Sequence, residues 1–140
     1  MLEIENAEIK IIVSVSDIIN NSDDFLFYSK CFKLLINFVS ESINYEATWE
    51  CYTGEIEEFK SGLINLTRSE KCDEVVFSPM LETGKLVIEK IIKPYETYCF
   101  KFILPSTVNS QISVQGMTML DQSYMPDIIT RLEELLYLYS

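Results

Sequence analysis

The sequence contains no histidine, and this removes the side chain that enzymes use most often as a general acid or base. Nucleophilic catalysis by a Ser–His or Cys–His pair is therefore excluded, whereas catalysis by a lysine or by paired carboxylates is not. The cysteines are far apart and form no C-x-x-C pair, so without histidine a zinc site is not expected. We expect free thiols in a reducing compartment. They are Cys31, Cys51, Cys72 and Cys99.

Glycine and proline are scarce, at four residues each. The sequence has neither of the phosphate-binding patterns G-x-G-x-x-G and G-x-x-x-x-G-K, nor the G-x-S-x-G of serine hydrolases, so we expect no cofactor. Residues 20–24 (NNSDD) form the one oxygen-rich loop, but they lack the spaced D-x-D pattern of a calcium site, and no metal is expected. Nothing resembles a linker, which predicts a single domain over residues 1–140.

Long hydrophobic runs are also missing, because no stretch approaches the ~20 apolar residues of a membrane-spanning helix. The first ten residues, MLEIENAEIK, carry acidic side chains where a signal peptide carries basic ones. We therefore expect a soluble, cytoplasmic protein that has no membrane partner.

Positive charge is the remaining deficit, since 22 acids stand against 11 bases and the net charge is −11. Residues 1–58 hold 12 of the acids and three of the bases. Such a charge repels phosphate backbones, so the sequence predicts no nucleic-acid partner and favours a basic protein partner instead. The alternative interpretation is that the acids serve solubility alone.

Residues 45–66 (YEATWECYTGEIEEFKSGLINL) predict a strand, a turn and a helix. The strand alternates, with Trp49 on the apolar face as a core anchor. Thr53 is the expected N-cap of the helix. Its apolar stripe at spacings of three and four consists of Ile56, Phe59, Leu63 and Leu66.

The rest of the chain alternates in a similar way and ends in a second amphipathic helix after Ser123. Residues 25–39 fit a strand bent near Lys30, but they also fit a helical stripe. No internal repeat is visible. The order βββαββββα predicts an α+β fold with mainly antiparallel sheets of about seven strands and two helices packed on them. The strands are expected at residues 9–15, 25–39, 44–52, 74–77, 85–93, 97–104 and 111–120.

Two stretches together carry a resemblance to a known family. The first is the tryptophan strand and acidic helix of residues 45–66, followed by EVVF at 74–77 and KLVIE at 85–89. The second is DQSYMPDIITRLEELL at residues 121–136. In this layout the chain resembles the WapI-like group of small bacterial immunity proteins. The resemblance implies a non-enzymatic inhibitor that binds the toxin domain of a contact-dependent polymorphic toxin, often a nuclease.

An acidic surface could occupy a groove that a nuclease uses for phosphate. From charge alone, the candidate partner-binding residues are Glu46, Glu50, Glu55, Glu57 and Glu58. Three of these acids lie in the first turns of the predicted helix, where the helix dipole is a sufficient reason for their presence. Two other functions stay open, namely an accessory interaction domain that acts as a homo-oligomer, and a small enzyme with a carboxylate or lysine centre.

Overall fold

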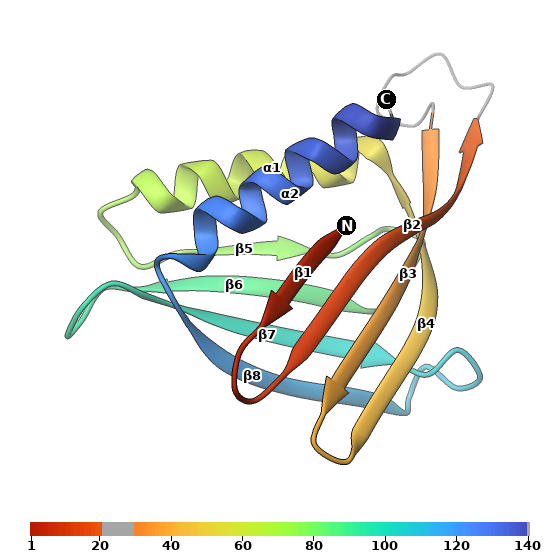
Figure 1. Cartoon of the computed structure of the whole chain (residues 1–140), viewed down its shortest axis with the longest axis horizontal. Helices are drawn as coiled ribbons and strands as arrows, with labels where there is room; N and C mark the ends of the chain where they lie inside the picture. Colours follow the sequence, from red (N-terminus) through yellow and green to blue (C-terminus); the bar gives the residue numbers. More distant parts are fainter. Residues whose placement is uncertain (21–29, 140) are drawn as a thin grey trace.

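The computed structural model describes residues 1–20 and 30–139, and within them four strands and a helix are followed by four more strands and a second helix (Figure 1). The elements are β1 (Leu2–Glu5), β2 (Lys10–Asn20), β3 (Lys30–Ser40), β4 (Ile43–Tyr52), α1 (Thr53–Arg68), β5 (Glu74–Phe77), β6 (Lys85–Ile91), β7 (Thr97–Pro105), β8 (Ser113–Asp121) and α2 (Tyr124–Tyr139). The predicted α+β fold is confirmed.

Each group of four strands forms its own antiparallel sheet, in the order β1-β2-β3-β4 (sheet A) and β5-β6-β7-β8 (sheet B). The order of four strands and one helix thus occurs twice. The sequence does not reveal this repeat, because the two halves share the order of their elements but not a residue pattern. The additional strand is β1, a four-residue strand that was not predicted. Residues 30–39 of the ambiguous segment are strand, whereas residues 25–29 lie outside the described residues.

The two helices lie side by side on one side of the molecule, where α1 contacts β5 and α2 contacts β1 (Figure 1). They cover a core to which both sheets contribute their inner faces. Trp49 is 1% exposed, which confirms it as a core anchor. The other large side chains that are fully buried include Phe32, Leu63, Tyr98 and Phe100.

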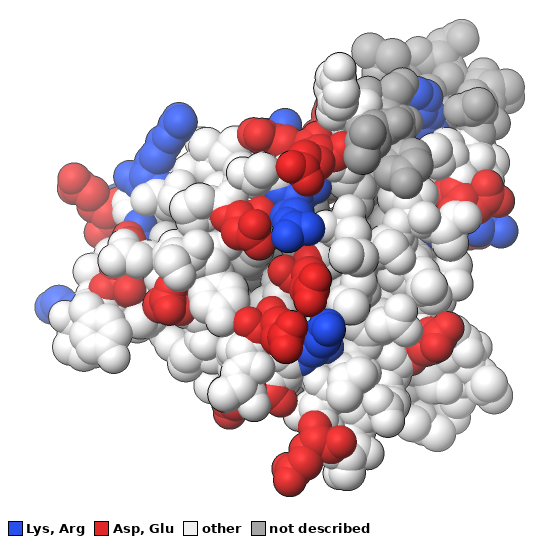
Figure 2. Space-filling view, viewed as in Figure 1, with Lys and Arg blue, Asp and Glu red and all other residues white. Residues whose placement is uncertain are grey.

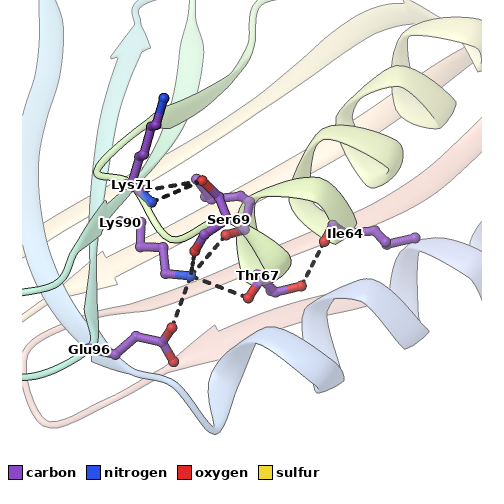
Figure 3. Close-up of polar contacts among 7 residues, drawn as sticks. Ile64, Thr67, Ser69, Lys71, Lys90 and Glu96 are labelled. Carbon is purple, nitrogen blue, oxygen red and sulfur yellow. Dashed lines mark hydrogen bonds and ion pairs between the residues drawn. The ribbon is translucent and has the colours of Figure 1, made fainter.

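A buried lysine joins sheet B to the end of α1. The side chain of Lys90, on β6, is 3% exposed, and its ammonium donates to the carbonyl oxygens of Leu66, Thr67 and Ser69 at 3.1, 3.2 and 2.6 Å (Figure 3). Glu96 pairs with the same nitrogen at 2.9 Å. A cation is favoured at the carbonyl end of a helix, where backbone acceptors have no partner within the helix. Burial on its own lowers the pKa of Lys90, but Glu96 and Tyr98 outweigh it and raise that pKa above its ordinary value.

A second polar contact joins the two sheets. The side-chain amide of Asn6, in the β1–β2 turn, donates to the hydroxyl of Thr118 on β8 at 2.8 Å. That hydroxyl donates in turn to the carboxylate of Glu8 at 2.6 Å. Thr118 is 2% exposed, so this contact satisfies a buried polar group while it holds β8 against sheet A.

The four cysteines are free thiols, of which Cys72 is exposed and the other three are buried. Burial raises the pKa of Cys31, Cys51 and Cys99, as expected for small hydrophobic side chains. Within residues 1–20 and 30–139, no helix has the length and apolar character needed to cross a membrane.

Candidate binding surface on sheet B

The five acids predicted from charge are distributed over two elements. Glu46 and Glu50 lie on the outer face of β4, whereas the other three lie on α1, where Glu57 and Glu58 are exposed. Glu55 is engaged in structure, because its two carboxylate oxygens accept the backbone N–H groups of Tyr52 and Met80, each at 2.9 Å. Glu55 therefore stabilises the start of α1 and holds the segment after β5 against this helix. Both of its carboxylate oxygens are hydrogen-bonded within the protein.

The outer face of sheet A mixes acidic, basic and neutral side chains at opposite positions of neighbouring strands. Lys33 stands between Asp17 and Glu50, and Glu46 lies opposite Asn37. On the side of the molecule shown in Figure 2, acidic and basic side chains also lie next to one another. Lys10 is 3.6 Å from Glu3 and 3.8 Å from Glu5. The acidity is therefore interrupted by bases on this side and does not form one continuous face.

The outer face of sheet B has a different character. Its side chains alternate with the core residues, and the row across the four strands is Val76, Val87, Lys101 and Met117. Val76 is 44% exposed, Met117 is 63% exposed, and Met119 on the same face of β8 is 45% exposed. Flexible methionine side chains at an exposed surface are typical of sites that adapt to a partner.

A hollow of about 530 Å³ lies along this face. Val87, Ile103 and Met117 contribute its apolar lining, and Lys85, Lys101, Glu74 and Gln115 contribute its polar groups. The Lys101 ammonium is 3.1 Å from Glu89, and the hydrogen bond and charge of Glu89 raise the pKa of Lys101. Lys85 is exposed, and the described part of the chain offers it no ion-pair partner.

A second hollow, of about 380 Å³, lies between β4 and the segments that precede β6 and follow β7. Two successive hydrogen bonds lie at its wall. The Trp49 indole donates to the Tyr45 hydroxyl at 3.1 Å, and that hydroxyl donates to the carbonyl of Pro105 at 2.8 Å. These groups are satisfied within the protein, and among residues 1–20 and 30–139 no buried side-chain nitrogen or oxygen lacks a hydrogen-bond partner.

No cluster of three or more cysteine, aspartate or glutamate side chains in the described residues could hold a metal ion. Residues 21–24 of the oxygen-rich loop lie outside that part of the chain.

The chain matches no protein-family model and no curated protein. Two solved structures are similar to it in fold. One is the plant transcriptional regulator PBF-2, at 9% identity over 98% of this chain and 80% of that chain, with a TM-score of 0.46. The other is WHY3 from Arabidopsis thaliana, at 11% identity over 96% of this chain and 84% of that chain, also with a TM-score of 0.46.

The function implied by the family resemblance needs correction. Of the two solved structures named above, one is described as a transcriptional regulator, and neither is described as an immunity protein. Neutralisation of a toxin domain through an acidic face is therefore withdrawn, as are the basic toxin partner and the exclusion of nucleic acid. The physical reason for the error is that the net charge of a stretch of sequence does not give the charge of a surface. Glu55 is hydrogen-bonded to backbone N–H groups, and Lys33 lies opposite Glu50 on the neighbouring strand. The resemblance to the WapI-like group itself stays a prediction.

The sequence of β8 contains a pattern that indicates the sheet B surface and that the net charge does not show. The stretch from Ser113 to Asp121 (SVQGMTMLD) alternates, and one of its two faces carries Gln115, Met117 and Met119. A strand with methionines on the face opposite Leu120 carries apolar side chains on both of its faces. Apolar side chains on the solvent-facing side of a sheet depart from the usual alternation and mark a candidate interaction surface.

Proposed function

We propose that the protein is a non-catalytic binding domain that holds another protein against the outer face of sheet B. The observation that carries the proposal is the hollow of about 530 Å³, which Met117 lines and beside which Val76 and Met119 are exposed on the same face of the sheet. Exposed apolar side chains gathered on one face of a domain are a mark of an interaction site.

The polar groups of this face support binding more than catalysis. Lys101 is ion-paired with Glu89, which raises the pKa of Lys101 and keeps it protonated, so it is disfavoured as a general base. Lys85 lies opposite Ile103 on the neighbouring strand and is one of the polar groups that line the hollow, where its charge can orient a partner.

The proposal is tested with two matched substitutions. Met119 and Val39 are each 45% exposed, the first on the outer face of sheet B and the second on the outer face of sheet A. Peptides are selected from a displayed random library of about 12-residue segments on the wild-type protein, long enough to span a strand. Their affinities for Met119→Glu and Val39→Glu are then measured by calorimetry.

We expect Met119→Glu to weaken binding by about tenfold or more, because it places a charge in an apolar contact, and Val39→Glu to leave it unchanged. Equal affinities for the two variants, or a loss confined to Val39→Glu, would overturn the proposal. So would a single-stranded oligonucleotide that binds the wild-type protein and competes with the peptides for this face.

A further inference from the structure

The edge of sheet B at β8 differs from the other three sheet edges. Edge strands expose unpaired N–H and C=O groups, and proteins normally guard them with short length, charge or a covering element. β1 has four residues, of which two are glutamates. β5 also has four, and α1 packs so closely on it that a Cβ on Gly62 would come within 2.8 Å of Val75.

β4 is long but guarded. It carries Glu46 and Glu50 on its outer face, and the outward N–H of Glu50 donates to the carboxylate of Glu82 at 2.8 Å. β8, in contrast, is nine residues long and contains neither lysine nor proline. Its one charged residue is Asp121, at its very end.

Hydrogen bonds at the two sides of β8 fix which of its backbone groups point outward. The carbonyl of Met119 accepts a bond from the Asn6 side chain at 3.4 Å, so this carbonyl is directed away from β7. In an antiparallel sheet the N–H and C=O of one residue point the same way and alternate along the strand. The backbone groups of Met117 and Gln115 therefore also point outward, and in the described residues neither finds a hydrogen-bond partner.

We propose that β8 receives an extended segment of the partner protein, which pairs with Gln115 and Met117 as a fifth strand of sheet B. The inference rests on the proposed function, since it names the way in which the partner is held. Backbone hydrogen bonds to the open edge would supply affinity, and alternate side chains would supply specificity.

Side chains and charge on both faces of β8 specify the chemistry of the segment. On the outer face, Met117 and Met119 would contact apolar side chains at alternate positions of the partner strand. On the inner face, Gly116 has no side chain, and the ring of Phe102 lies against it, with Cζ 2.9 Å from the position of a Cβ. Asp121 is exposed, and its hydrogen bonds with Ser123 hold its pKa below the ordinary value, so a cationic side chain is complementary at that end. The occupant is thus an extended strand with apolar side chains at alternate positions and a single basic residue at the end that lies near Asp121.

The test uses two substitutions at a single position. Gln115→Pro removes the outward N–H, while Gln115→Ala removes the same side chain and keeps that N–H, and proline is tolerated on an edge strand. The probes are the peptides selected on the wild-type protein. We expect Gln115→Pro to weaken binding by about tenfold relative to Gln115→Ala, because one strand hydrogen bond is lost and its neighbours are disturbed.

Hydrogen exchange on the wild-type protein gives a second readout that needs no substitution. The amides of Gln115 and Met117 are expected to exchange rapidly in the free protein and to be protected when a peptide is bound. If Met119→Glu weakens binding while Gln115→Pro and Gln115→Ala bind equally and both amides stay unprotected, the strand pairing is wrong and the proposed function stands. If Met119→Glu has no effect, the proposed function fails. A free protein that is dimeric, and becomes monomeric in Gln115→Pro, would show that a second copy occupies the edge and would overturn the inference.

Discussion

The ammonium of Lys90 lies 2.6 Å from the carbonyl oxygen of Ser69, the residue that follows the last turn of α1. A lysine on a strand of sheet B thus binds the C-terminal carbonyl groups of α1, the helix that directly follows the last strand of sheet A (Figure 3). This bond fixes α1 relative to β6, and α1 in turn covers β5 at the edge of sheet B. Sheet B, which carries the proposed binding surface, is thus joined to the end of α1 by a buried cation.

Removing that cation is expected to be costly. Lys90→Met keeps the aliphatic part of the side chain but leaves three carbonyl oxygens without their donor, at a cost of roughly 2–4 kcal/mol in the free energy of unfolding. Lys85→Met, the same change at an exposed position of the same strand, is expected to stay within about 0.5 kcal/mol. Urea unfolding of both variants measures the difference, and equal values for the two would contradict the structural role of Lys90.

The raised pKa of Lys90 predicts a dependence of stability on alkaline pH. A cation whose pKa is higher in the folded than in the unfolded state contributes its full stability below the unfolded value, near 10.5, and loses that stability as the pH rises through the folded value. The stability difference between the wild-type protein and Lys90→Met should therefore be constant from about pH 7 to pH 9 and shrink above about pH 10.5. Unfolding curves over this range measure it. A difference that grows with pH would show that the lysine is not held as a cation.

Gly84 is expected to accept no larger residue, because a Cβ there would lie 2.5 Å from Cη2 of the buried Trp49 and 2.8 Å from Cδ of Pro105. Gly84→Ala should lower the free energy of unfolding by about 1–3 kcal/mol through overpacking. In a Trp49→Phe background the indole atoms in question are gone, so the same substitution should cost less. A double-mutant cycle measures this coupling, and additive effects would mean that Trp49 is not the obstacle.

Among the acids of α1, Glu55 is expected to matter for stability and Glu58 is not. Glu55→Ala removes an acceptor from the N–H groups of Tyr52 and Met80, with an expected loss of about 1–2 kcal/mol. Glu58→Ala is the control at an exposed position of the same helix, with an expected change within about 0.5 kcal/mol. Thermal unfolding of the two variants gives the comparison, and a larger effect at Glu58 would refute the assignment.

The alternation of residues was sufficient to predict the fold class, since strands such as β4 and β6 bury every second side chain along most of their length and α1 follows a clear apolar stripe. Thr53 was expected to be the N-cap of the first helix. The N-cap is instead Tyr52, and the carboxylate of Glu55 accepts the hydrogen bond of its backbone N–H. That bond, like the contact between Lys90 and the end of α1, joins backbone and side-chain atoms whose proximity no local pattern encodes.

The candidate site was less accessible to sequence reasoning, for a physical reason. Net charge is a sum over the chain, while a surface depends on which residues lie opposite one another across strands. Lys33 is 17 residues from Glu50 in sequence and directly opposite it in the sheet. Likewise, Val76 and Met117 join a single row only through the pairing of β5, β6, β7 and β8.

The most direct test of partner binding at sheet B is the map of amide chemical-shift changes in the isotope-labelled protein when a selected peptide is added. We expect changes at Val76, Val87, Met117 and Met119 on the outer face of sheet B, with Val39 and Glu46 on sheet A unchanged. Changes that centre on sheet A or on the exposed faces of α1 and α2, with Met117 and Met119 unaffected, would contradict binding at this face.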